Sequence, residues 1–284
     1  MKRASLALLI IGHLLSGCGT ELPGPADDPA SAIAAQSGGS SGIAVHLQRA
    51  SSWGQSKNGN VWQYGHFEVL VRNLAYAKDV AVHYKAKDGG WRDLQLAYRE
   101  PATGDEELWT GFSRLDDNQP GDNRFPLEFA VRYRVAGQTY WDNNGGRNYR
   151  VGAWDGPLLG PGVQVLAAHT DGGFSNPMRI GIDTRDLPGP KLLRVHYTED
   201  DWATSLLIHA TPTAGSYAMP GENIPATIQS PNAIGVTHWE VSLPRPTRPF
   251  KFALAYVVGS ATYWDNHYQR NYLFQNDFPN PQHP

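Results

Sequence analysis

The chain contains a single cysteine, Cys18, among its 284 residues. An intramolecular disulfide is therefore excluded, and any folded domain must be held together by its apolar core. Beyond the first residues, no stretch approaches the roughly 18 apolar residues that a membrane-spanning helix needs. The formal net charge is −3 and the basic residues form no stripe, which argues against a nucleic-acid partner.

Signatures of catalysis and metal binding are also missing. The sequence has no nucleophile elbow, no H-E-x-x-H pattern and no P-loop. Its histidines show no metal-ligand spacing, and the acidic run from Asp116 to Asn123 lacks the spacing of a calcium-binding EF-hand loop. We therefore expect no enzymatic activity, no cofactor and no metal ion. Carboxylates are plentiful, so counting them does not exclude a glycosidase pair.

Glycine, proline and aromatic residues are abundant, with Gly 30, Pro 21, Tyr 13 and Trp 9. This composition favours short strands and turns, and no segment has a convincing amphipathic helical pattern. The length allows one large domain or two ordinary ones.

The first residues are organised like an export signal. Lys2 and Arg3 precede the apolar run from Ala4 to Leu15, and Leu-Ser-Gly leads into Cys18. This resembles the lipobox of bacterial lipoproteins, which implies removal of a signal peptide at residues 1–17 and acylation of Cys18. The alternative is an ordinary secretory signal with an incidental cysteine.

Residues 18–42 are rich in Pro, Ala, Ser and Gly, and we expect a disordered linker there. With the anchor, this predicts a protein lipid-anchored in the bacterial cell envelope. The outer membrane is favoured, because Gly19 follows the cysteine in place of the aspartate associated with inner-membrane retention.

One motif occurs twice, as TYWDNNGGRNYRV from Thr139 and as TYWDNHYQRNYLF from Thr262. Each copy follows a segment of alternating apolar residues, at 126–135 and 249–258, which predicts a strand. The earlier stretches VAVHYKAKDGGW and LRVHYTEDDW also correspond, so we interpret the chain as a duplication. The predicted fold is all-β, with two tandem immunoglobulin-like antiparallel β-sandwiches at residues 43–152 and 161–275, the second divergent.

The repeated motif places aromatic rings beside carboxamides. In a strand one of Tyr140 and Trp141 must face the core and the other outward. An exposed indole next to Asn and Asp suits a sugar, whose C–H face stacks on the ring while its hydroxyls need donors and acceptors. The alternative is that the rings are core residues and the polar loop only bonds its own backbone. Repetition of the polar residues favours a shared polar task.

The stretch YWDNNGGRNY resembles the signature of carbohydrate-binding module family 21, the starch- and glycogen-binding domain, and VAVHYKAKDGGW resembles the strand and turn before it. The resemblance implies non-catalytic binding of α-1,4-linked glucan, and it puts the site on a turn tryptophan, the motif aromatic and two asparagines. The corresponding residues are Trp91, Trp141, Asn143 and Asn148 in the first unit, and Trp202, Trp264, Asn266 and Asn271 in the second.

The second unit departs further from the family pattern, because His267, Tyr268 and Gln269 replace Asn144 and two glycines. Tyr268 then either adds a stacking surface or plugs the site. In both units an aromatic that some members carry is an alanine, Ala130 or Ala253, which predicts a smaller platform. The expected partners are an α-glucan and the membrane, through Cys18. The alternative function is a structural or adhesive pair of domains without sugar binding.

Overall fold

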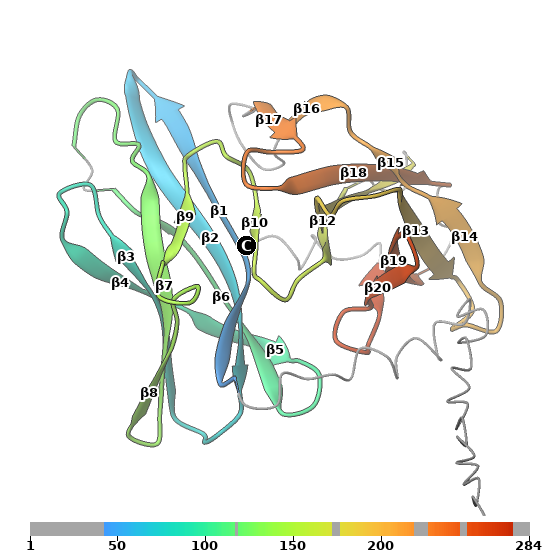
Figure 1. The fold of residues 1–284 in the computed structure, drawn as a ribbon, viewed down its shortest axis with the longest axis horizontal. Helices are drawn as coiled ribbons and strands as arrows, with labels where there is room; N and C mark the ends of the chain where they lie inside the picture. The colour runs from blue at the N-terminus through green and yellow to red at the C-terminus, as the bar shows by residue number, and fades with distance from the viewer. Residues whose placement is uncertain (1–42, 117–118, 172–176, 219–226, 245–248, 275–284) are drawn as a thin grey trace, which may run out of the picture.

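The computed structural model describes residues 43–116, 119–171, 177–218, 227–244 and 249–274 (Figure 1). All regular elements in these ranges are β-strands, which confirms the predicted all-β class. Within these ranges there is accordingly no helix with the length and apolarity to cross a membrane. The predicted signal peptide, Cys18 and the linker lie outside the described residues.

The first unit consists of two antiparallel sheets. The first sheet has the order β10-β1-β2-β6-β5. Its strands are β1 (Val45–Lys57), β2 (Asn60–Arg72), β5 (Ala97–Pro101), β6 (Glu106–Arg114) and β10 (Leu158–Leu159). The second sheet has the order β4-β3-β7-β8, with β9 also paired to β7. Its strands are β3 (Lys78–Lys85), β4 (Trp91–Gln95), β7 (Leu127–Val135), β8 (Gln138–Asp142) and β9 (Tyr149–Val151).

The second unit repeats this topology. Its first sheet has the order β11-β12-β18-β15, and its second the order β14-β13-β19-β20 with β21 paired to β19. The first contains β11 (Val165–Asp171), β12 (Met178–Arg185), β15 (Thr211–Pro212) and β18 (Val236–Leu243). The second contains β13 (Lys191–Thr198), β14 (Leu206–His209), β19 (Phe250–Val258), β20 (Ala261–Asp265) and β21 (Tyr272–Phe274). A separate hairpin joins β16 (Gly215–Ala218) to β17 (Thr227–Ser230).

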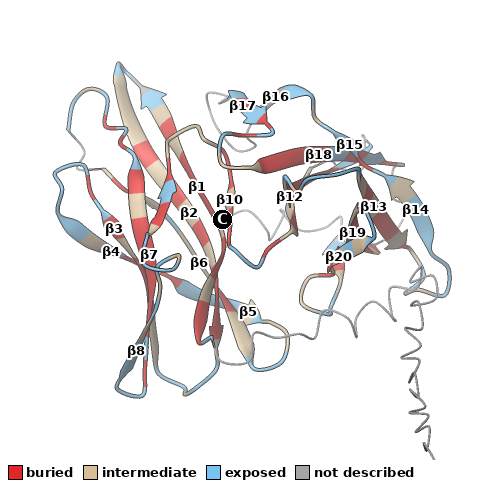
Figure 2. Cartoon of the chain, in the orientation of Figure 1, coloured by how far each residue is buried: buried red, intermediate tan, exposed pale blue. Residues whose placement is uncertain are grey.

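Each unit has its own apolar core between its sheets. In β7 and β19, alternate residues point into the core, as the period of two predicts. Trp239 is buried and donates its indole N–H to Thr184 Oγ1 at 2.8 Å, while Trp109 is half-buried against the first core. Figure 2 shows the contrast between the mostly buried β7 and the outlying, largely exposed β14.

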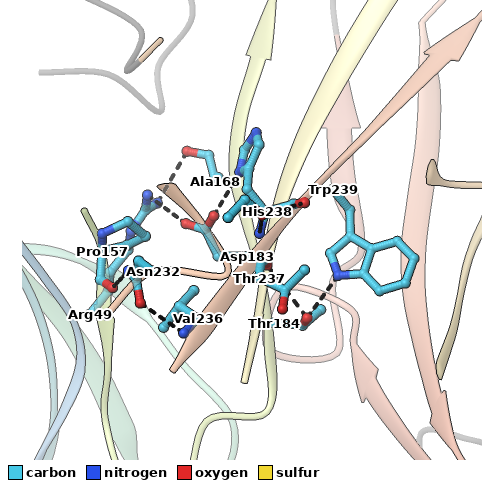
Figure 3. A network of polar contacts seen from close by, with 11 residues as sticks. Arg49, Pro157, Ala168, Asp183, Thr184, Asn232, Val236, Thr237, His238 and Trp239 are labelled. Carbon is cyan, nitrogen blue, oxygen red and sulfur yellow. Dashed lines mark hydrogen bonds and ion pairs between the residues drawn. The ribbon is translucent and has the colours of Figure 1, made fainter. Parts of the chain in front are cut away.

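The two units lie side by side, with β10 of the connecting segment between them (Figure 1). Arg49 on β1 forms an ion pair with Asp183 on β12, with Nη2 and Oδ2 2.8 Å apart (Figure 3). Asp183 is fully buried and also bonds His238 Nδ1 at 2.8 Å. Asn232 Nδ2 donates to the Pro157 carbonyl of the connecting segment at 2.9 Å. These contacts hold the second unit against the first.

Candidate functional site

The repeated Asp and Tyr of the motif form part of the scaffold. The Asp142 carboxylate accepts the Leu47 backbone N–H at 2.8 Å and the Tyr149 hydroxyl at 2.8 Å. Burial, and then the negative charge of Asp142, raises the pKa of Tyr149, so its hydroxyl remains a donor. The pair therefore fixes the motif loop to the first strand of the sandwich, a role that both copies keep.

The second copy repeats this arrangement. Asp265 accepts the Ala167 backbone N–H at 3.0 Å and the Tyr272 hydroxyl at 2.6 Å. Part of the repeated polar set thus serves the fold, although its repetition in the sequence favours a shared polar task. Tyr149 and Tyr272 are both buried, so the second tyrosine of each motif copy packs in the core of its unit.

The loop between β8 and β9 uses its first asparagine to form a turn. Asn143 accepts the Asn148 N–H on its backbone carbonyl at 2.8 Å and the Gly146 N–H on Oδ1 at 2.9 Å. Gly145 and Gly146 take φ values of 64° and 87°, which side-chain-bearing residues rarely adopt. Among the described residues, the exposed Nδ2 of Asn143 has no hydrogen-bond partner, so it can donate to a ligand.

Asn148 is held more firmly. Its Nδ2 donates to Glu128 Oε1 on β7 at 2.8 Å, and this bond is the main reason that the pKa of Glu128 lies below its usual value. Asn148 Oδ1 has no partner in the described part of the chain. The two asparagines therefore leave one donor and one acceptor open at the same loop.

Trp91 and Trp141 stand on the outer face of the second sheet, 43% and 47% exposed. The prediction that both indoles reach solvent is confirmed. His83 lies between them: its ring is parallel to Trp91, with centroids 4.8 Å and planes 8° apart, and edge-on to Trp141 at 5.6 Å and 72°. We call Trp91, His83 and Trp141 the aromatic platform. Ala130 is opposite His83 on β7, so the strand-paired neighbour of the imidazole is a small side chain.

A chain of charged groups supports the platform. His83 Nδ1 lies 2.7 Å from Asp93 Oδ1, and the buried Arg132 bonds Asp93 and contacts Asp79 at 3.4 Å. Burial opposes ionisation of Asp93, but the bonds from His83 and Arg132 lower its pKa below the usual value. His83 is not among the site residues predicted from the sequence. Strand alternation is the signal that could have found it, because it puts His83 on the same outward face as its strand-paired neighbours.

The second unit does not present an equivalent platform. Trp264 is only 7% exposed and Asn266 only 6%, so the expectation of a second exposed indole with its asparagine is wrong for these side chains. Trp202 is half-buried and packs against Trp264 together with Ala253 and Ala255. Asn271 is half-buried, and its Oδ1 is enclosed without a hydrogen-bond partner in the described structure.

The turn before Trp202 explains this closure. In the first unit Gly89 adopts the left-handed φ of 86°, and Trp91 then starts β4 opposite Lys85. The second unit has no glycine there, so Asp201 and Trp202 themselves take φ values of 56° and 70°. Trp202 consequently lies in a turn outside any strand, since pairing resumes only at Leu206.

The second motif loop also contacts the first unit. His267 Nε2 and Arg270 Nη2 lie 3.3 and 3.0 Å from the Glu100 carboxylate on β5. Tyr268 lines a small cavity between the units, together with Glu68 of β2. In this arrangement Tyr268 is directed to the neighbouring sandwich and does not extend an exposed platform.

No group of three or more acidic, histidine or cysteine side chains in the described ranges is arranged to hold a metal ion.

Residues 55–152 match the family model described as Carbohydrate/starch-binding module (family 21). Protein phosphatase 1 regulatory subunit 3E of Mus musculus is 40% identical over 94 residues, 32% of this chain and 29% of that protein. Glucoamylase 1 of Rhizopus oryzae is 32% identical over 89 residues, 30% of this chain and 13% of that protein. Each of these matches therefore spans less than a third of the relative's length.

Among solved structures, the starch-binding domain of Rhizopus oryzae glucoamylase in complex with β-cyclodextrin and maltoheptaose is 27% identical. The similarity covers 40% of this chain and 96% of that one, with a TM-score of 0.31.

Proposed function

We propose that the first unit binds α-1,4-linked glucan without catalysis. The observation that carries the proposal is the aromatic platform, with two indoles exposed on one sheet face and carboxamide groups open on the adjoining loop. A glucose ring stacks its C–H face on such indoles, and its hydroxyls bond the amides. The family match at residues 55–152 and the named relatives support the same ligand class.

The proposal assigns the main contacts to Trp91, Trp141, Asn143 and Asn148. A shallow aromatic site of this kind binds in roughly the millimolar to micromolar range, about −4 to −8 kcal/mol. For the second unit we propose no comparable site in the described arrangement, because Trp264 and Asn266 are covered. We nevertheless propose that the second unit is a divergent copy of the same module, because it shares the strand order and the repeated motif of the first.

We further propose that Cys18 carries the lipid anchor and that the glucan is captured at the bacterial cell envelope, with the outer membrane favoured. This rests on the sequence of the first 19 residues alone. Cys18→Ala should move the protein from the membrane fraction, from which detergent extracts it, to the aqueous fraction. Continued membrane association of the variant would contradict the anchor.

Affinity electrophoresis in native gels with and without soluble starch tests glucan binding. The folded protein should migrate more slowly only in the starch gel. Unretarded migration is what the alternative function, a structural or adhesive pair of domains, predicts. Release of reducing sugar from starch would contradict the non-catalytic part of the proposal.

A further inference from the structure

The central ring of the aromatic platform is the imidazole of His83, and only one of its two nitrogens has a hydrogen-bond partner among the described residues. His83 Nδ1 is taken by Asp93 at 2.7 Å, and the ring is fixed against the two flanking indoles. The ring is about one-third exposed, with 31% of the side chain accessible. In the described part of the structure, Nε2 at the distal edge of the ring has no hydrogen-bond partner.

The state of Nε2 follows from its support. The Asp93 carboxylate is also bonded by the buried Arg132, whose cation favours the ionised, acceptor-only form. Nδ1 must therefore donate its proton to Asp93. In the neutral imidazole this leaves a lone pair on Nε2, so the platform contains a hydrogen-bond acceptor between two apolar surfaces.

From this geometry we propose that His83 is a glucan-contacting residue that determines specificity, accepting a hydrogen bond from a hydroxyl of the bound sugar at Nε2. Asp93 and Arg132 act as positioning residues, because they fix the tautomer and orientation of the ring. The inference rests on the proposed function and deepens it. Stacking alone tolerates many flat apolar ligands, whereas an acceptor held between the indoles selects a ligand with a hydroxyl at that place.

Calorimetric titration with maltoheptaose of the wild type and of two His83 variants tests this. His83→Phe keeps an aromatic ring for stacking but has no ring nitrogen, and should weaken binding about fivefold to tenfold. His83→Gln reaches the position of Nε2 with an amide oxygen and should remain within about threefold of the wild type. His209→Gln, at an exposed histidine of the second unit, is the control and should leave the affinity unchanged.

The titrations distinguish failure of the proposed glucan binding from failure of the role inferred for His83. No binding by the folded wild type overturns the proposed function together with this inference. Measurable binding that His83→Phe leaves unchanged overturns the inference alone. Equal losses in His83→Phe and His83→Gln also overturn it, because they would show that the packing of the imidazole matters and not its acceptor. Thermal unfolding of each variant shows that the folded state is retained.

Discussion

The imidazole of His83 lies parallel to the indole of Trp91, with ring centroids 4.8 Å apart and planes inclined by 8°. This stack joins neighbouring strands, since His83 is on β3 and Trp91 on β4. Because Trp141 meets the same imidazole edge-on from β8, three strands fix the aromatic platform. A surface held in this way needs little reordering when a ligand binds.

Removing both exposed indoles should abolish glucan binding without unfolding the protein. The double variant Trp91→Ala/Trp141→Ala loses the stacking surface, whereas neither side chain is buried in the core. Affinity electrophoresis in starch should show no retardation, and the melting temperature should be nearly unchanged. A large loss of stability would instead mean that the two indoles act as core residues.

The matched control for this variant is the corresponding indole of the second unit. Trp264 is 7% exposed, so Trp264→Ala should reduce the free energy of unfolding by about 3–5 kcal/mol. The folded fraction of the Trp264→Ala protein should be retarded by starch as strongly as the wild type is. Loss of starch binding by a folded Trp264→Ala protein would show that the second unit contributes a site.

Asp142→Asn should destabilise the first unit by about 2 kcal/mol. The carboxylate accepts bonds from the Leu47 N–H and the Tyr149 hydroxyl, and the amide that replaces it supplies only one acceptor oxygen. Denaturant unfolding measures the change. Asp105→Asn, at an exposed carboxylate, is the control and should change the stability little. Asp155 is not used as the control, because its carboxylate also accepts a backbone N–H, that of Gly152. A stability equal to the wild type would contradict the scaffold role of the motif aspartate.

Arg49→Ala should destabilise the contact between the units by about 3–5 kcal/mol, because it leaves the fully buried Asp183 without its cation. Arg72→Ala breaks the exposed pair with Asp105 and should cost less than about 1 kcal/mol. Denaturant unfolding should show the larger loss in the Arg49 variant. Equal effects of the two substitutions would contradict a structural role for the pair between the units.

Two acidic groups near this contact, Asp183 and Glu68, should contribute to the stability with opposite dependences on pH. Burial favours protonation of Asp183, but the Arg49 charge and then the His238 bond lower its pKa below 3.8. Its contribution to stability is therefore present above pH about 3.8 and is lost as the pH falls through the lowered pKa. Burial raises the pKa of Glu68 above 4.5, against the attraction of Arg49 and Arg99. Its contribution is greatest below pH about 4.5 and declines as the pH rises through the raised pKa.

Glu68→Gln removes the loss of stability that ionisation of Glu68 causes as the pH rises. The free energy of unfolding of the variant should therefore increase relative to that of the wild type above pH about 4.5, and the difference between the two should be smaller below that pH. Unfolding curves at several pH values measure the difference, with the exposed Glu240→Gln as a control for net charge. A difference that does not change with pH would contradict the raised pKa of Glu68.

The local parts of the fold could be predicted from the sequence, because alternation of apolar residues records which face of a strand is buried. It required one of the neighbours Tyr140 and Trp141 to face the core, and the structure packs Tyr140 against the core and exposes Trp141. The position of the hairpin turn between β7 and β8 is not marked by alternation. The turn lies at Ala136 and Gly137, which take the positive φ values of 48° and 76°.

The closed second unit and the supported histidine could not be predicted in the same way. The position of Trp202 depends on which residue of its turn adopts the left-handed backbone, and a repeat match does not contain that information. The Arg49–Asp183 pair joins residues far apart in the chain, and no local pattern marks such partners. His83 became a candidate only when its neighbours on β4 and β8 were known.

The most direct test of the account follows the indole N–H signals of the protein by NMR during titration with maltoheptaose. The signals of Trp91 and Trp141, assigned through single Trp→Phe variants, should shift progressively and saturate, while those of the buried Trp239 and Trp264 stay in place. Saturating shifts confined to Trp202 and Trp264, or no shifts at all, would contradict the claim that the exposed indoles of the first unit bind glucan.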